Sequence, residues 1–139
     1  MVGGKIIFGV LKGKPVWDNE VWHLKSIACT ADGKDVWMIA KNTTSNGNDT
    51  VWKSIDYGRN FSRIGLTESR RSLECIVVSD DGGCVYIPML DSGSAYVMVL
   101  NSNGQELDKW QLPAQAVNGI SRINLFKDEI FYRCSTASI

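Results

Sequence analysis

The side chains most able to do chemistry lie in one short stretch, where Ser54, Asp56 and Gly58 stand at alternate positions. A hydroxyl and a carboxylate this close together could transfer a proton or bind a metal ion. The stretch separates a short apolar run at residues 51–52 from a second short segment at residues 62–64. Asp-x-Gly between two strands predicts a hairpin turn, in which Gly58 adopts a positive φ and Asp56 accepts backbone hydrogen bonds. We therefore interpret Asp56 as a residue that ties a turn together, not as a reagent.

Other residues with catalytic potential do not form a known pattern. His23 is accompanied by no Gly-x-Ser-x-Gly turn and no Cys/His pairing. No phosphate-binding loop is present, and the oxygen-rich loop at residues 46–49 does not match a calcium loop. We expect no catalytic residue, no cofactor and no metal. The four cysteines form no Cys-x-x-Cys pair, so we predict small buried side chains, with a disulfide or a reactive thiol as the alternative. They are Cys29, Cys75, Cys84 and Cys134.

Composition indicates one soluble domain of 139 residues, 44% apolar and 22% charged. Fifteen basic residues balance fifteen acidic ones, so we expect neither nucleic acid nor an anionic membrane as a partner. No segment approaches the ~18 apolar residues of a membrane helix. The apolar run at residues 6–11 is too short for a secretory signal, which predicts synthesis in the cytosol without a signal peptide.

The elements that would position these residues are short strands. The apolar runs are rich in Val, Ile and aromatic residues and are separated by turn-forming residues, which predicts an all-β fold. Gly33 and Gly82 end two similar segments 49 residues apart, and a third copy at residues 122–132 lacks the glycine. Gly13, Gly58 and Gly104 each follow another apolar run, at spacings of 45 and 46 residues. Two interleaved hairpins with a period in the mid-forties are typical of a four-stranded propeller blade.

The spacing Ser54-x-Asp56-x-Gly58-x-x-Phe61 resembles the Asp-box, or BNR repeat, of β-propellers such as sialidases, sortilin-like receptors and bacteriophage tail and surface proteins. The resemblance implies the fold and a structural role for these four residues. The related turn at residues 101–104 keeps only the glycine, and residues 9–13 are more degenerate. A sialidase activity would also need an arginine triad and an Arg-Ile-Pro signature, whereas Arg63-Ile64 is followed by Gly65.

The repeats divide the single domain, residues 1–139, into three blades. Complete blades span about residues 25–66 and 73–112, and residues 5–21 and 121–135 form complementary halves of a third. A closed propeller needs ~4–8 blades, so we predict a homodimer of about six blades in which each chain completes the split blade of the other. A β-sandwich and an open three-blade array are the alternatives.

An up-and-down topology places the loops between second and third strands, and those between blades, at one end of the domain. These loops are longer and more varied, so we expect binding there. Trp37 and Trp52 are predicted to pack between blades, and Trp110 to be partly exposed. The candidate ligand-binding residues are Asn42, Asn46, Arg70, Arg71 and Trp22.

We expect a non-catalytic binding or structural module that displays loops for protein or glycan contact. A bacteriophage virion protein of the tail or capsid, made in the cytosol and released in a particle, would suit the resemblance. Its partners would be a second copy, other virion proteins or a surface glycan. The alternatives are a dimeric propeller lectin and, less favoured, a sialidase-like glycoside hydrolase.

Overall fold

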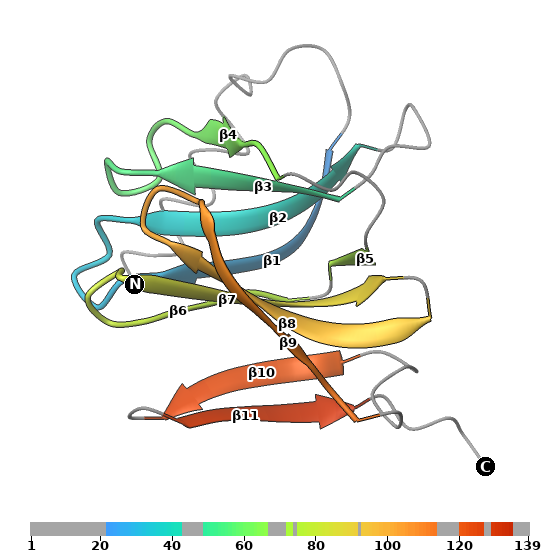
Figure 1. Cartoon of the computed structure of the whole chain (residues 1–139). Helices are drawn as coiled ribbons and strands as arrows, with labels where there is room; N and C mark the ends of the chain where they lie inside the picture. The colour runs from blue at the N-terminus through green and yellow to red at the C-terminus, as the bar shows by residue number, and fades with distance from the viewer. Residues whose placement is uncertain are drawn as a thin grey trace.

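A computed structural model describes residues 22–42, 49–66, 72–73, 75–91, 93–113, 120–126 and 129–134. These residues form antiparallel strands and no helix (Figure 1). The predicted N-terminal half-blade, residues 5–21, lies outside them. The strands are β1 Trp22–Cys29, β2 Val36–Asn42, β3 Asp49–Ser54, β4 Ser62–Ile64, β5 Ser72–Leu73, β6 Val77–Val78, β7 Cys84–Asp91, β8 Ser94–Asn101, β9 Glu106–Gln111, β10 Ile120–Phe126 and β11 Glu129–Cys134.

Sheet 1 contains β1, β2, β3 and β4 in sequence order. Each strand pairs antiparallel with the next, so the sheet is a simple meander. The side chains of β2 alternate between two buried clusters, with Trp37 and Ile39 on one face and Val36, Met38 and Ala40 on the other. A strand whose two faces are both buried needs apolar residues at every position, which explains the run from Val36 to Ala40.

Sheet 2 has the order β5, β7, β8, β9, and β6 also pairs with β7. The first strand of sheet 2 is therefore divided into two short pieces, β5 and β6. Ser72 and Leu73 pair with one end of β7, and Val77 and Val78 with the other. Pro88 stands opposite the break, and a proline has no N–H to donate to a ladder.

The ribbon, our name for β10 and β11, is a third antiparallel unit, and β10 lies beside β6 and β7. In Figure 1 the ribbon lies below sheet 2, with sheet 1 above sheet 2.

The first strand of each unit carries one extra residue at a similar place. In β1 the pairing shifts by one residue between Leu24 and Ser26, and in β10 between Ile120 and Arg122. Between β5 and β6 the same one-residue shift occurs relative to β7. A bulge increases the local twist and bends its strand. The three units therefore share a one-residue shift in the first strand.

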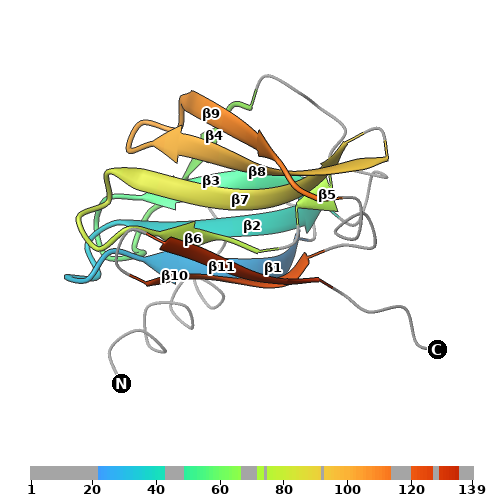
Figure 2. The same ribbon diagram turned by 60° about the horizontal axis from the view of Figure 1, so that its bottom comes forward.

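The main core lies between sheets 1 and 2, which stack face to face (Figure 2). Burying each large apolar side chain contributes about 1.5–3 kcal/mol, so this contact holds the two sheets together. The buried side chains of this core are Trp37, Ile39 and Val51 of sheet 1 with Leu73, Ile76, Val85, Ile87, Met89, Met98 and Leu100 of sheet 2.

The prediction of an all-β fold of short antiparallel strands is confirmed in the described residues. The sheets do not close into a ring among these residues, so propeller closure stays a prediction. Trp37 and Trp52 are buried, while Trp110 is 42% exposed. The expectation of a buried Cys29 is wrong, because this thiol lies exposed at the end of β1.

Candidate functional site

The turn between β3 and β4 is held by the side chains of Ser54 and Asp56. The Ser54 hydroxyl donates to Asp56 Oδ1 at 2.7 Å and accepts the N–H groups of Asp56 at 3.2 Å and Gly58 at 2.9 Å. Asp56 Oδ1 also accepts the Asn60 N–H at 2.9 Å, and Asp56 Oδ2 accepts from Asn60 Nδ2 at 2.7 Å. Gly58 has a φ of 79°, which only glycine adopts without strain. Phe61 is buried and packs beside Trp52, anchoring the end of the turn.

These hydrogen bonds decide what Asp56 can do chemically. Donation from Ser54, followed by donation from Asn60, lowers the pKa of Asp56 to about 2. A general acid at neutral pH needs a raised pKa, whereas Asp56 is ionised and its oxygens accept hydrogen bonds within the turn. The geometry therefore indicates that Asp56 stabilises the turn.

The same arrangement occurs in the first turn of each sheet. Thr30 Oγ1 donates to Asp32 Oδ1 at 2.7 Å, and Ser79 Oγ donates to Asp81 Oδ1 at 2.8 Å. The pKa of Asp32 is lowered mainly by Thr30, and that of Asp81 mainly by the Gly83 N–H. Sequence reasoning used this repeat only to align the glycines. The hydroxyl-x-carboxylate-Gly pattern was the signal that would have revealed the shared hydrogen bonds.

A fourth turn, between β8 and β9, uses an amide in place of the carboxylate. Asn101 Oδ1 accepts the N–H groups of Asn103 at 2.9 Å and Gln105 at 3.0 Å. Gly104 has a φ of 81°. The turn therefore keeps its form although it has neither the Ser nor the Asp.

All four turns lie at one end of the two sheets, on the left in Figure 1, which we call the turn end. Hydrogen bonds and an ion pair connect the turns there. The Ala31 N–H donates to the Asp80 carbonyl at 3.1 Å, which joins the first turns of sheets 1 and 2. Lys53 Nζ donates to the Ser102 carbonyl and lies 3.3 Å from Asp35 Oδ2, so it links three segments. These contacts join the turns of sheets 1 and 2 to one another.

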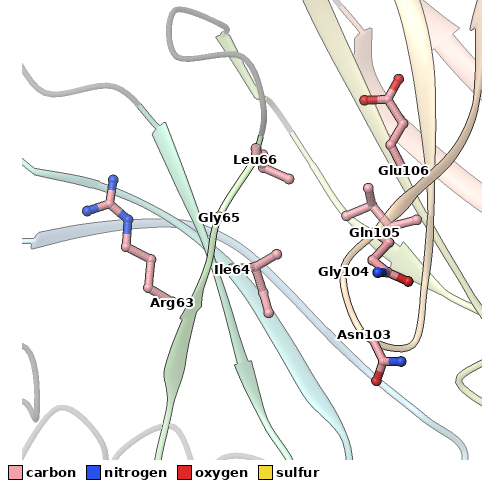
Figure 3. A pocket seen from close by; sticks show the side chains of 9 residues that line it. Arg63, Ile64, Gly65, Leu66, Asn103, Gly104, Gln105 and Glu106 are labelled. Carbon is pink, nitrogen blue, oxygen red and sulfur yellow. The ribbon is translucent and has the colours of Figure 1, made fainter.

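A groove of about 420 Å³ lies between the end of β4 and the turn from β8 to β9 (Figure 3). The side chains of Ile64 and Leu66 point towards the turn, and that of Arg63 points away from it. Asn103, Gln105 and Glu106 supply amide and carboxylate groups on the opposite wall. An aliphatic wall facing polar groups suits a small ligand that has both apolar and hydroxyl surfaces, and the volume is in the usual range for ligand pockets. No sequence pattern pointed to this groove.

Two of the predicted ligand-binding residues lie together at the opposite end, called here the loop end. Trp22 is the first residue of β1 and Asn42 the last of β2, and they stand directly opposite each other. Trp22 therefore opens the first strand of sheet 1. Asn46, Arg70 and Arg71 lie outside the described residues.

Asp49 was expected in the loop, but it begins β3 and its side chain is only 6% exposed. Its Oδ2 lies 2.9 Å from Lys25 Nζ and accepts the Leu73 N–H at 2.9 Å. The buried Oδ1 has no hydrogen-bond partner. Asp49 therefore joins sheet 1 to sheet 2 at the loop end, and sequence reasoning missed this because both partners lie 24 residues away.

Within the described ranges, no group of three or more His, Cys, Asp or Glu side chains could hold a metal ion. The same residues include no helix that is long and apolar enough to cross a bilayer. No protein-family model matches the chain, and no curated protein matches it.

Proposed function

We propose that the chain is a non-catalytic binding or structural module of the β-propeller type, which closes to about six blades as a homodimer. The observation that carries the proposal is the recurrence of one structural unit, with the same extra residue in its first strand. Stacked sheets of such units are the building principle of propellers. Hydrogen bonds hold the turns at the turn end, so we expect partners to bind the loops at the loop end.

A virion accessory protein is the setting that we propose for this module. The support is the resemblance of residues 54–61 to turns found in bacteriophage tail and surface proteins. The partners would then be other virion proteins or a surface glycan. In this role the turn carboxylates stabilise the fold, consistent with the lowered pKa of Asp56.

The proposal is tested by the mass in solution and by single-particle images. We expect twice the chain mass of 15.4 kDa and end-on views of a ring with about six blades. A screen with fluorogenic glycosides should find no hydrolysis. A stable monomer without a ring, or turnover of a glycoside, would contradict the proposal.

Carbohydrate binding is the second candidate, and the groove beside β4 favours it. Ile64 and Leu66 offer an aliphatic surface for the apolar face of a sugar, and Asn103 and Glu106 offer partners for hydroxyl groups. A glycan array would test it, with Asn103→Ala and Glu106→Gln in the groove and Gln111→Ala as a control at an exposed position outside it. Glycan binding that only the groove variants weaken would support a lectin, and binding to no glycan would exclude this candidate.

A further inference from the structure

The strand β11 has an outer edge to which no described strand is paired. In sheet 1 the second strand, β2, pairs with β3 on its outer side, and in sheet 2 the second strand, β7, pairs with β8. Among the described strands, β11 pairs with β10 only. Because a free edge presents unpaired N–H and C=O groups, it is a template for another strand.

The two faces of the ribbon differ in how far their side chains are buried. Ile123 is buried, and Leu125 and Ile130 are half-buried, so this face is packed. Asn124 and Phe131 stand directly opposite each other on the other face, and both are exposed. Phe131 is 52% exposed, although an aromatic ring gains much by burial. The free edge and the open face meet on β11.

We propose that residues 5–21 of a second copy of the chain supply the missing strands at the edge of β11, an inference that rests on the proposed propeller dimer. This segment contains an apolar run at residues 6–11, a glycine at position 13 and a second run at residues 15–17. The glycine lies 45 residues before Gly58, in register with the turn between β3 and β4. The segment therefore has the pattern of a third and a fourth strand.

The order of the layers favours a second copy over the chain's own segment. Residue 21 adjoins Trp22, which begins β1 in sheet 1, whereas the ribbon lies on the far side of sheet 2. Two spacings between packed sheets amount to about 20 Å. Even if the segment's last strand ended at Trp17, the extended chain from there to Trp22 would span only about 18 Å, and it would have to pass around sheet 2. A second copy meets no such limit.

Two-fold symmetry makes the exchange reciprocal, because each copy offers one β11 edge and one segment 5–21. Once the sheet of β10 and β11 is completed, the next sheet of the ring, which belongs to the second copy, would pack on this face and cover the Phe131 ring. Backbone pairing would then hold the dimer together, with aromatic burial adding to its stability.

Photo-cross-linking distinguishes exchange from pairing within one chain. p-Benzoylphenylalanine in place of Phe131 would be introduced into the full chain, and unlabelled and ¹⁵N-labelled chains would be refolded together. We expect cross-linked peptides from residues 5–21, about half of which join a light chain to a heavy chain. Links to residues 5–21 within single chains only, or the absence of any link to residues 5–21, would overturn the proposal.

The variant Phe131→Glu tests the same contact without a probe. Because a buried unpaired charge is costly, we expect dimer dissociation to become easier by at least about tenfold in sedimentation equilibrium. Ile55→Glu is the matched control, since Ile55 is 65% exposed in the turn after β3 and should leave the dimer unchanged. A dimer that survives Phe131→Glu would overturn the strand exchange while the propeller dimer stands. A monomeric wild-type chain would overturn both.

Discussion

Gly104, in the turn between β8 and β9, lies directly against Ile64 of β4. A Cβ added to Gly104 would overlap Ile64 Cγ2. The missing side chain thus allows the outer turn of sheet 2 to approach the outer strand of sheet 1. Gly104 and Ile64 both line the groove, so their contact brings its two walls together.

Substitution of Gly104 tests the importance of that approach. Gly104→Ala should lower the free energy of unfolding by about 2–4 kcal/mol, since it adds overpacking to the strain of a positive φ. Gly93→Ala is the matched control, because Gly93 has the same φ of 81° but no neighbour within 4 Å. It should cost only about 1 kcal/mol. Equal losses in chemical denaturation would show that the contact with Ile64 is unimportant.

The pKa of Asp56 predicts a dependence of stability on acid pH. Because this pKa is lowered from 3.8 to about 2, the stability that the ionised carboxylate confers is present above about pH 4. It is lost as the pH falls through that window towards 2. The denaturation midpoint of Asp56→Asn should therefore fall less between pH 5 and pH 2 than that of the wild type.

A partial effect is expected from Asn60→Ala, which removes one donor to Asp56 and leaves Ser54 in place. Its acid sensitivity should lie between those of the wild type and Asp56→Asn. Identical pH profiles for all three proteins would show that the turn network does not stabilise the fold.

The buried carboxylate of Asp49 predicts a large effect at the loop end. Asp49→Ala removes the partner of Lys25 Nζ and of the Leu73 N–H, so it should cost about 3 kcal/mol of unfolding free energy. Asp80→Ala, at an exposed position, is the control and should change stability by less than about 0.5 kcal/mol. In a double-mutant cycle, Lys25→Met should cost less once Asp49 is absent. Additive losses would argue against a coupled pair.

Tyr57 is a site at which stability can be gained. Its φ of 63° lies in the left-handed region, and its N–H donates to the Lys34 carbonyl at 3.0 Å. Since asparagine tolerates this conformation better, Tyr57→Asn should raise the free energy of unfolding by about 0.5–1 kcal/mol. Ile55→Asn, two residues earlier and also exposed, should have little effect. A loss of stability in Tyr57→Asn would show that the exposed ring packs more strongly than its 45% exposure indicates.

Local patterns predicted the turns better than they predicted the strands. Gly33 and Gly82 were placed correctly in equivalent turns, because a left-handed residue in a short turn favours glycine. The division of the first strand of sheet 2 was not predicted. The N–H of Ile76, in the gap between β5 and β6, donates to Ser26 Oγ of sheet 1 at 3.2 Å. Such a partner, 50 residues away, leaves no local signal.

The all-β character and the positions of the turns follow from local sequence, because Ser54, Asp56 and Gly58 bond to one another within four residues. The packing of the sheets buries Asp49 between them, brings Gly104 against Ile64 and leaves β11 with an open edge among the described strands. The two groups of features differ in the range of the interactions. Turn hydrogen bonds depend on neighbouring residues, whereas burial and strand pairing depend on which distant segments the packing of the sheets brings together.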